Sequence, residues 1–368
     1  MATPSPARSF LGTMSLVFLA ISAIAVADMF LAKTERAESR VEAARLFKQG
    51  QAAITHGENA EAIERIRDAI SIERGNRDYL RTLAQAQLTA GKTADAESTL
   101  ADLLQTDSTD GLASLIMARV LVKEGRFSEA ISYFHRAVYG QWNQDAAANQ
   151  LRARFELIDL LAAHYSKEEL LAELLPIQDQ PRGDLKMRTR LGQLFLQAGS
   201  PARAAVLFRA VLHDAPSNAE AYEGIGDAEF AQSQYRAAQR DFQAALRLAP
   251  DEQTARKNLD LCDELLTLDP TLRGIGQEER FRRSLKLVEL TQGETSQCAG
   301  PNPAPELQGL LDTAAKALKA HVRAARQAVA SESNLDLAEQ LWQARRKECK
   351  PPPATDNPLA LVLARIVQ

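Results

Sequence analysis

The sequence has few aromatic residues, few cysteines and no recognisable ligand set for a metal. Aromatic residues make up 5% of the 368 residues, whereas strands are enriched in aromatic and β-branched side chains. Alanine and leucine, which are both favourable in helices, are plentiful. The three cysteines include no C-x-x-C pair, and the five histidines include no H-x-x-x-H pair, so the usual spacings of zinc ligands are missing. We therefore expect an all-α chain without a metal or another cofactor.

The motifs of common enzymes are also missing. The sequence contains no G-x-S-x-G, no phosphate-binding P-loop and no Rossmann glycine motif. Lysine and arginine number 44 against 48 acidic residues, for a net charge of −4, whereas a nucleic-acid-binding domain usually carries a strongly basic face. We therefore expect neither an enzyme nor a nucleic-acid-binding protein.

One long apolar stretch lies near the N-terminus. Residues 10–31 form a run of 22 residues whose only charged side chain is Asp28, near its end. A helix of about 20 apolar residues crosses the hydrocarbon core of a bilayer. We therefore expect a short tail at residues 1–9, followed by a transmembrane helix or signal anchor at residues 10–32.

The same stretch has features of a cleaved secretory signal. Arg8 precedes the apolar core, and Ala25 to Ala27 fit the A-x-A pattern of a cleavage site. Cleavage after Ala27 is therefore the alternative. The apolar run continues past this site to Leu31, where a mature secreted chain would usually be polar, and this favours the uncleaved anchor.

The middle of the chain repeats with a period of 34 residues. Gly57, Gly91 and Gly125 are spaced by 34, and so are Pro216 and Pro250. This is the period of the tetratricopeptide repeat (TPR), in which each repeat is a pair of helices. The same spacing relates Ala62, Ala96 and Ala130, Gly192 and Gly226, Ala204 and Ala238, and Phe208 and Phe242.

These repeats resemble the TPR family in residue type as well as in period. The family motif has a small residue at position eight, alanine at twenty, a large apolar residue at twenty-four and proline at thirty-two. Residues 219–252 match it with Gly226, Ala238, Phe242 and Pro250. Small residues are needed where the two helices cross closely, because a bulky side chain there overpacks the interface. The resemblance implies an all-α solenoid of helix hairpins.

The resemblance covers residues 43–252, as an array of about six repeats. The fourth repeat, at about residues 151–184, is degenerate, because it has large residues at the small positions and follows an insertion of six residues. A repeat array needs a cap at its end, and we expect residues 253–268 to form a capping helix. The remaining residues, 269–368, lack the repeat and are predicted to form a small C-terminal helical domain.

The resemblance also implies a concave groove lined by the first helix of each repeat, which takes a protein or peptide partner. Its groove positions predict a surface that is basic and polar in the middle repeats and acidic at the end. The candidate partner-binding residues are Asp78, Arg81, Gln85, Arg119, Lys186, Thr189, Gln193, Glu220, Glu223 and Asp227.

The C-terminal region carries a candidate disulfide. Helices are expected at about residues 277–291, 306–330, 335–348 and 358–366, separated by prolines. If the second and third of these pair as a hairpin, Cys298 and Cys349 lie toward the same end. A bridge between them would persist only in an oxidising compartment. Two unrelated thiols are the alternative.

A dense basic run in the same region is interpreted as a solvated helix face, with an acidic lipid or an acidic partner as the alternative. The run comprises Arg273, Arg280, Arg282, Arg283 and Lys286.

The expected function is that of a membrane-tethered scaffold or adaptor, similar to bacterial envelope-associated TPR proteins. The charges that follow the span, Lys33, Arg36 and Arg40, favour the cytoplasm for the repeats by the positive-inside rule. The candidate disulfide favours the exported, periplasmic side, which we expect, with the cytoplasmic side as the alternative. The runner-up function is a secreted soluble TPR protein, cleaved after Ala27, that acts as an enzyme accessory or ligand-binding module through its C-terminal helical domain.

Overall fold

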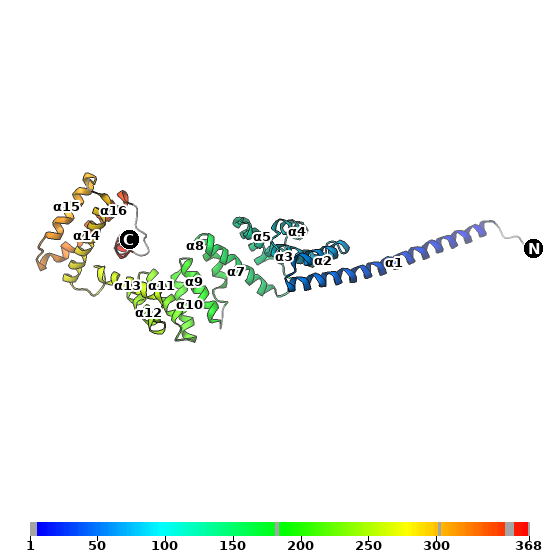
Figure 1. Cartoon of the computed structure of the whole chain (residues 1–368), viewed down its shortest axis with the longest axis horizontal. Helices are drawn as coiled ribbons and strands as arrows, with labels where there is room; N and C mark the ends of the chain where they lie inside the picture. The colour runs from blue at the N-terminus through cyan, green and yellow to red at the C-terminus, as the bar shows by residue number, and fades with distance from the viewer. Residues whose placement is uncertain (1–5, 181–183, 301–302, 350–356, 367–368) are drawn as a thin grey trace, which may run out of the picture. The chain divides into compact units, whose positions relative to one another are not determined.

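The computed structural model describes residues 6–180, 184–300, 303–349 and 357–366, with the backbone alone for residues 6–28, 31 and 32. The secondary structure of these residues is helical (Figure 1), apart from one isolated β-bridge between Asp110 and Gln141. The predicted fold class, an all-α array of TPR-like helix pairs, is confirmed.

The helices divide into two compact units, the first ending at Tyr165 and the second beginning at Ser166. In the first unit, two helices that open a repeat begin at Arg77 and Gly111, which are 34 residues apart. The side chains of Asn76 and Asp110 accept hydrogen bonds from backbone N–H groups in the first turn of these helices, and such caps define where a helix begins. The helices of the first unit are α1 (Pro6–His56), α2 (Asn59–Ile72), α3 (Arg77–Thr89), α4 (Thr93–Thr106), α5 (Gly111–Lys123), α6 (Phe127–Tyr139) and α7 (Ala146–His164).

Helix α1 is continuous over 51 residues and contains the predicted span at residues 10–32. Most of that span belongs to the residues whose side chains are not described. Among the described residues, no helix is apolar over enough of its length to cross a membrane. The C-terminal part of α1 packs against α2 through buried side chains such as Ala43, Leu46 and Ala53.

The six-residue insertion after α6 folds back onto the start of α5. The backbone of Gln141 pairs with that of Thr109 and Gly111, with N···O distances of 2.7 and 2.9 Å. The indole of Trp142 packs directly on Gly111, where any Cβ atom would collide with it. Its Nε1 donates a hydrogen bond of 2.9 Å to the carbonyl of Ala137. The insertion is therefore an ordered part of the first unit.

The second unit continues the repeat and then departs from it. Within the repeat, Phe208 is fully buried against Gly192 of its own repeat and Gly224 of the next, which shows why small residues are required there. The elements of the second unit are α8 (Lys167–Leu174), η1 (Leu175–Ile177), α9 (Leu185–Gln197), α10 (Pro201–Asp214), α11 (Ala219–Ala231), α12 (Tyr235–Leu248), α13 (Gln253–Leu268), α14 (Gln277–Ala299), α15 (Pro305–Lys319), η2 (Ala324–Arg326), α16 (Gln327–Glu348) and α17 (Pro358–Ile366).

Helix α13 occupies the predicted capping position, but it is not the end of the core. Its Leu261 and Leu265 belong to one apolar cluster with Leu287 of α14, Leu341 of α16 and Leu363 of α17. The C-terminal helices therefore cover the face that a terminal cap would leave to solvent.

The C-terminal helices differ from the prediction in two places. The helix expected at residues 277–291 continues to Ala299. The helix expected at residues 306–330 ends at Lys319, and a new helix begins at Gln327. The single prediction of a helix over 306–330 is thus wrong, and residues 327–334 belong with the helix expected at 335–348. The last fully buried residue of α15 is Ala314, and beyond it only the partly buried Ala317 and Leu318 pack against the apolar core before the helix ends. Helix α16 instead returns along α14.

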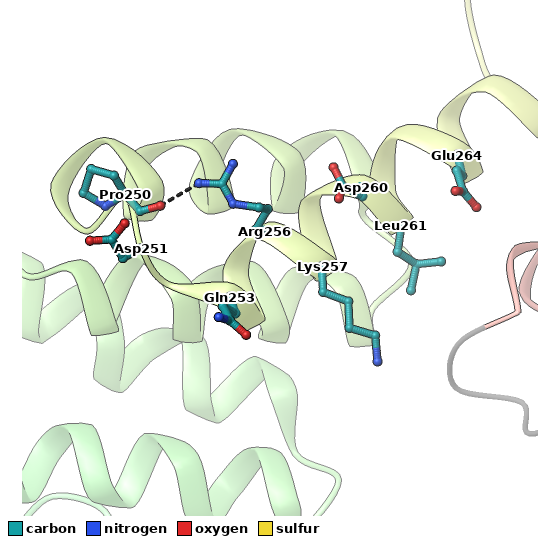
Figure 2. Close-up of a pocket in the computed structure, with 8 residues that line it drawn as sticks. All are labelled: Pro250, Asp251, Gln253, Arg256, Lys257, Asp260, Leu261 and Glu264. Atoms are coloured by element: carbon teal, nitrogen blue, oxygen red, sulfur yellow. Dashed lines mark hydrogen bonds between the residues drawn. The ribbon is translucent and has the colours of Figure 1, made fainter.

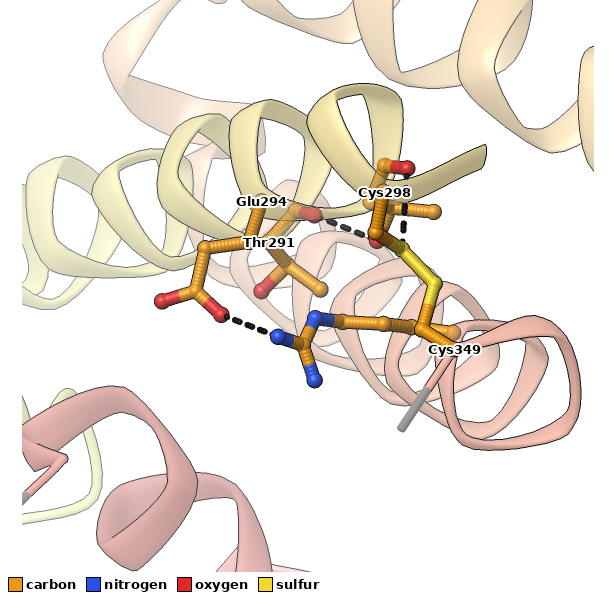
Figure 3. The surroundings of a disulfide bond; sticks show 6 residues. Thr291, Glu294, Cys298 and Cys349 are labelled. Carbon is orange, nitrogen blue, oxygen red and sulfur yellow. Dashed lines mark hydrogen bonds and ion pairs between the residues drawn. A yellow bond between two sulfur atoms is a disulfide. The ribbon is translucent and has the colours of Figure 1, made fainter. Parts of the chain in front are cut away.

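This return brings two cysteines together (Figure 3). Cys298, in the last turn of α14, and Cys349, directly after α16, are joined in a disulfide with their Cα atoms 6.0 Å apart. One helical turn before Cys349, Arg345 of α16 forms an ion pair of 3.2 Å with Glu294 of α14. The third cysteine, Cys262, is a fully buried free thiol.

Candidate functional site

In the first unit, the predicted groove residue Arg81 lies in the interior. Its side chain is 10% exposed, and its Nε and Nη2 donate hydrogen bonds of 2.7 and 2.5 Å to Oδ2 of Asp110. Its Nη1 donates a third bond of 2.6 Å to Asp78. Arg81 therefore holds α3 to the start of α5 and is not a free groove cation.

The second predicted cation of this unit is also paired. Arg119 of α5 donates hydrogen bonds of 2.8 and 2.5 Å to the two carboxylate oxygens of Glu156 of α7. Gln85 is half-buried on α3, where its amide lies 3.5 Å from the hydroxyl of Thr89. Both arginines predicted for the groove of the first unit are therefore paired, because neighbouring elements supply the acidic partners Asp110 and Glu156.

A hollow of about 340 Å³ lies beside Arg81. The insertion contributes Trp142 to its wall, and α5 contributes the partly exposed Leu112. Asp110 and Asp78 carry two negative charges against the single positive charge of Arg81, so the hollow keeps a net charge of about −1. The side chain of Asp78 is largely exposed, which leaves this charge screened by solvent.

In the second unit, the structure brings four of the six predicted residues together. Gln193 of α9 and three acidic residues of α11, Glu220, Glu223 and Asp227, line one hollow of about 480 Å³. Thr189 is buried and donates a 3.0 Å hydrogen bond to the carbonyl of Leu185. Lys186 is exposed and does not line the hollow. These two predicted residues therefore lie apart from the site.

Sequence reasoning missed a fourth carboxylate. Glu252 is the N-cap of α13 and accepts a hydrogen bond of 3.3 Å from the backbone N–H of Thr254. It is the final residue of the repeat at 219–252 and lies outside the first helix, so the groove positions of the repeat motif do not include it. We define the acidic pocket by the carboxylates of Glu220, Glu223, Asp227 and Glu252. Its remaining lining residues are Gln193, Leu196, Phe208, Ala219, Gly224, Ala245 and Ala249.

Two of the carboxylates are oriented by amides. The side chain of Gln193 donates a 2.7 Å hydrogen bond to Glu220, and that of Asn258 donates a 2.9 Å hydrogen bond to Asp227. Glu223 lies between them on α11, one helical turn from each. These contacts link α9, α11 and α13 across the pocket.

The pocket disfavours its own negative charge. Burial raises the pKa of Glu223 to about 7, and the neighbouring charges of Asp227, Glu252 and Glu220 add to this shift. Burial also raises the pKa of Asp227, although the hydrogen bond from Asn258 opposes the shift. A bound cation would relieve both the repulsion and part of the desolvation. The electrostatics therefore favour a positively charged ligand group.

The acidic pocket combines negative charge with partly apolar walls, and none of its lining side chains is a nucleophile beside a base. Among the described residues, no group of three or more His, Cys, Asp and Glu side chains is placed to hold a metal ion. The walls also include the apolar side chains of Leu196 and Phe208. A pocket of this kind suits the ammonium or guanidinium end of a long aliphatic side chain.

A larger hollow, of about 670 Å³, lies along α13 (Figure 2). All of its lining residues come from the single segment 250–264, and they carry charges of both signs. Nη2 of Arg256 donates a 2.6 Å hydrogen bond to the carbonyl oxygen of Pro250, which is drawn in Figure 2. This hollow contains none of the predicted groove residues and has no predominant charge.

Comparison with known families identifies the repeats. Two tetratricopeptide-repeat family models match the chain, one over residues 53–120 and the other over residues 189–252. The chain contains tetratricopeptide repeats in both of these segments. The second match contains Gln193, Glu220, Glu223, Asp227 and Glu252, so the acidic pocket lies within recognised TPR sequence.

No curated protein matches this chain in sequence. Similar solved structures include YrrB, a TPR protein described as having an unusual peptide-binding site, at 20% identity and a TM-score of 0.42, over 52% of this chain and 95% of YrrB. A TPR protein from Cytophaga hutchinsonii is 17% identical, with a TM-score of 0.45, over 66% of this chain and 95% of its own. The TPR2AB domain of yeast Sti1, in a complex with pHSP90, is 15% identical, with a TM-score of 0.30, over 85% of this chain and 99% of the domain.

Proposed function

We propose that this chain is a non-catalytic scaffold that binds a peptide segment of another protein, with a lysine or arginine side chain of that segment in the acidic pocket. The observation that carries the proposal is the convergence of four carboxylates on one hollow at the first-helix face of the last repeats. First helices line the groove in the TPR family, which the chain resembles. YrrB is described as having a peptide-binding site, and peptide binding by this chain is part of the proposal.

The acidic pocket supports a cationic partner group by its charge balance. Its lining contains four acidic residues and no basic residue. Glu223 has no hydrogen-bond partner among the described residues, so it is available to a ligand. Close pairs of opposite charge across interfaces contribute measurably to affinity when they are shielded from water.

We also propose that the scaffold is tethered to a membrane by residues 10–32, with the repeats on the exported side. The tether is supported by the length and apolar character of this stretch in the sequence. The exported side is supported by the Cys298–Cys349 disulfide, since disulfides persist mainly in oxidising compartments.

The binding proposal is tested with three fluorescent peptides that are identical except for Lys, Gln or Glu at one central position. Fluorescence anisotropy with the full chain should give at least tenfold tighter binding of the Lys peptide than of the Gln peptide, which corresponds to about 1.4 kcal/mol, and weaker binding of the Glu peptide. The variant Glu223→Gln with Asp227→Asn should lose this preference.

A matched control has the same change of charge outside the pocket. Asp260 and Glu264 are exposed on α13 and line the neighbouring mixed hollow. The variant Asp260→Asn with Glu264→Gln should keep the preference for lysine. Equal binding of the Lys and Gln peptides by the wild-type chain, or an equal loss in both variants, would remove the acidic pocket as the binding site.

A further inference from the structure

A second pocket of the same unit has the opposite charge. It is a hollow of about 440 Å³ between the start of α12, the connection from α13 to α14, and α17. We define the arginine pocket by Arg236 and Arg240 of α12, Arg273 of the connection and Arg365 of α17. No aspartate or glutamate lines it, and the other lining residues are Ser233, Gln234, Tyr235, Ala237, Leu266, Thr271 and Leu272.

Three of these four arginines have no acidic partner. Arg365 pairs with the buried carboxylate of Asp269 and also bonds to Thr271. By contrast, Arg236, Arg240 and Arg273 form no ion pair or hydrogen bond through their side chains within the described part of the chain. A protein with a net charge of −4 thus leaves three guanidinium groups unpaired around one hollow, although acidic side chains neutralise Arg81, Arg119 and Arg126 elsewhere.

The pocket is assembled from residues that are distant in sequence. Three of the five members of the basic run that the sequence displays have acidic partners, because Arg282 and Arg283 share Glu279 and Lys286 pairs with Glu289. Only one member of that run, Arg273, lines the arginine pocket. The spatial cluster of positive charge is therefore a different set of residues, and the fold creates it.

The turn beside the pocket departs from the other repeats. The hairpin turns at Gly57, Gly91, Gly125 and Gly199 have φ angles of 80°, 79°, 76° and 70°, where glycine is favoured. The equivalent position before α12 is Ser233, with φ of 59°. Its hydroxyl lies at the pocket and accepts a 3.4 Å hydrogen bond from the hydroxyl of Tyr235. The chain therefore has a polar side chain at a position where glycine would be less strained.

We propose that the arginine pocket binds a phosphate-bearing small molecule or headgroup. Guanidinium groups bind phosphate through paired, charge-assisted hydrogen bonds, and several unpaired arginines match the charge of a phosphate monoester, which is about −1.5 to −2 at pH 7. The hollow also has apolar walls at Leu266, Leu272 and the ring of Tyr235, which suit the organic part of such a ligand. The hydroxyls of Ser233 and Thr271 offer further hydrogen bonds to phosphate oxygens.

The proposal is tested by calorimetric titration of the full chain with sn-glycerol 3-phosphate, and by sedimentation with phosphatidic acid vesicles or phosphatidylcholine vesicles. The wild-type chain should bind the soluble ester, or phosphatidic acid more than phosphatidylcholine. The variant Arg236→Gln with Arg240→Gln should weaken this binding at least tenfold. Because both side chains are exposed and unpaired, the variant should stay folded, and circular dichroism checks this.

The control is Arg247→Gln, which removes one exposed arginine from α12 outside the pocket and should change the affinity by less than twofold. Binding of the soluble ester identifies a free phosphate compound as the source, and binding of the vesicles alone identifies a lipid headgroup. The proposal is overturned if neither probe binds, if sodium acetate at equal ionic strength competes as well as the ester, if the control variant loses as much affinity, or if only an acidic peptide binds through these arginines.

Discussion

The ring of Phe208 lies between two helices that each contribute a glycine to its contact surface. A Cβ atom on Gly192 would lie 2.7 Å from its Cζ, and one on Gly224 would lie closer still. Phe208 is fully buried, so the ring cannot move away without shifting the repeat. The glycines are therefore required by packing at the junction of two repeats.

We predict that Gly224→Ala lowers the free energy of unfolding by about 1–3 kcal/mol, because the added methyl group overpacks a filled interface. Urea denaturation followed by circular dichroism measures this. Gly293 of α14 is the control, since a Cβ atom there has no neighbour within 4 Å. Gly293→Ala should stabilise by about 0.5–1 kcal/mol, because alanine is favoured over glycine inside a helix. Equal effects at the two positions would contradict the packing argument.

A second prediction at this scale concerns Arg81 and Arg119, which the repeat motif places at similar groove positions. Arg81→Ala leaves Asp110, whose side chain is 2% exposed, without its charged partner, and should cost about 3–5 kcal/mol. Arg119→Ala breaks a pair whose side chains are 33% and 30% exposed, and should cost at most about 1 kcal/mol, since solvent screens such pairs. Chemical denaturation of both variants tests this, and a cost for Arg119→Ala as large as that for Arg81→Ala would refute it.

The sequence predicts which residues lie on the first helices of the repeats better than it predicts which side chains pair with them. The 34-residue motif places Gln193, Glu220, Glu223 and Asp227 on the first helices, and the structure collects all four in one pocket. The motif carries no information on which side chain a neighbouring repeat turns toward a groove residue. For this reason the motif predicts Arg81 and Arg119 as partner-binding groove residues, although Asp110 and Glu156 pair with them.

At the scale of elements, periodicity predicts the helix pairs of the repeats and fails where the period ends. The apolar pattern of residues 306–330 is compatible with one helix, yet the chain turns after Lys319, and α16 packs along α14. No glycine or proline marks this turn in the sequence. It follows from the packing of α16 on α14, which a local pattern cannot reveal.

The disulfide fixes the ends of that helix pair. Replacing both cysteines with serine opens a loop that spans 51 residues of sequence, and the chain-entropy model assigns about 4 kcal/mol to such a bridge. We predict faster amide hydrogen exchange in α14 and α16 of the Cys298→Ser, Cys349→Ser variant, with exchange in α3 to α6 unchanged. Reduction of the wild-type chain should reproduce the effect. Unchanged exchange in α14 and α16 would show that the bridge contributes nothing to their pairing.

At the scale of the whole molecule, the fold class could be predicted from the sequence, whereas the tether at residues 10–32 and its exported side stay predictions. The charges that follow residues 10–32 favour the cytoplasm, and the Cys298–Cys349 disulfide favours the exported side that we propose. The mass of the chain and the number of its free thiols, when it is purified from its own cell, decide between the two compartments.

We predict that the protein, purified without reductant, has its full-length mass, occurs in the membrane fraction and contains one free thiol. That thiol is Cys262, and burial raises its pKa to about 12, so alkylation should succeed only after denaturation. Intact-mass spectrometry before and after alkylation measures all of this. Three free thiols would contradict export, and a chain that begins at Asp28 would contradict the tether and favour the secreted alternative.

The proposed function depends most directly on the ionisation of Glu223. Its pKa is raised to about 7 in the unliganded protein, so near neutral pH the pocket must release a proton when a cation binds. The lysine of a ligand stays protonated over this range. Affinity for a cationic peptide should therefore rise as the pH increases through 7, and Glu223→Gln should remove most of this dependence.

Binding of a cationic side chain in the acidic pocket is tested by calorimetric titration of the Lys peptide at pH 6 and pH 8, in buffers of different ionisation enthalpy. We predict tighter binding at pH 8, with net proton release near pH 7 in the wild-type chain and almost none in Glu223→Gln. Affinity that is independent of pH, or a proton release that persists in Glu223→Gln, would contradict the claim that a cationic side chain binds in the acidic pocket.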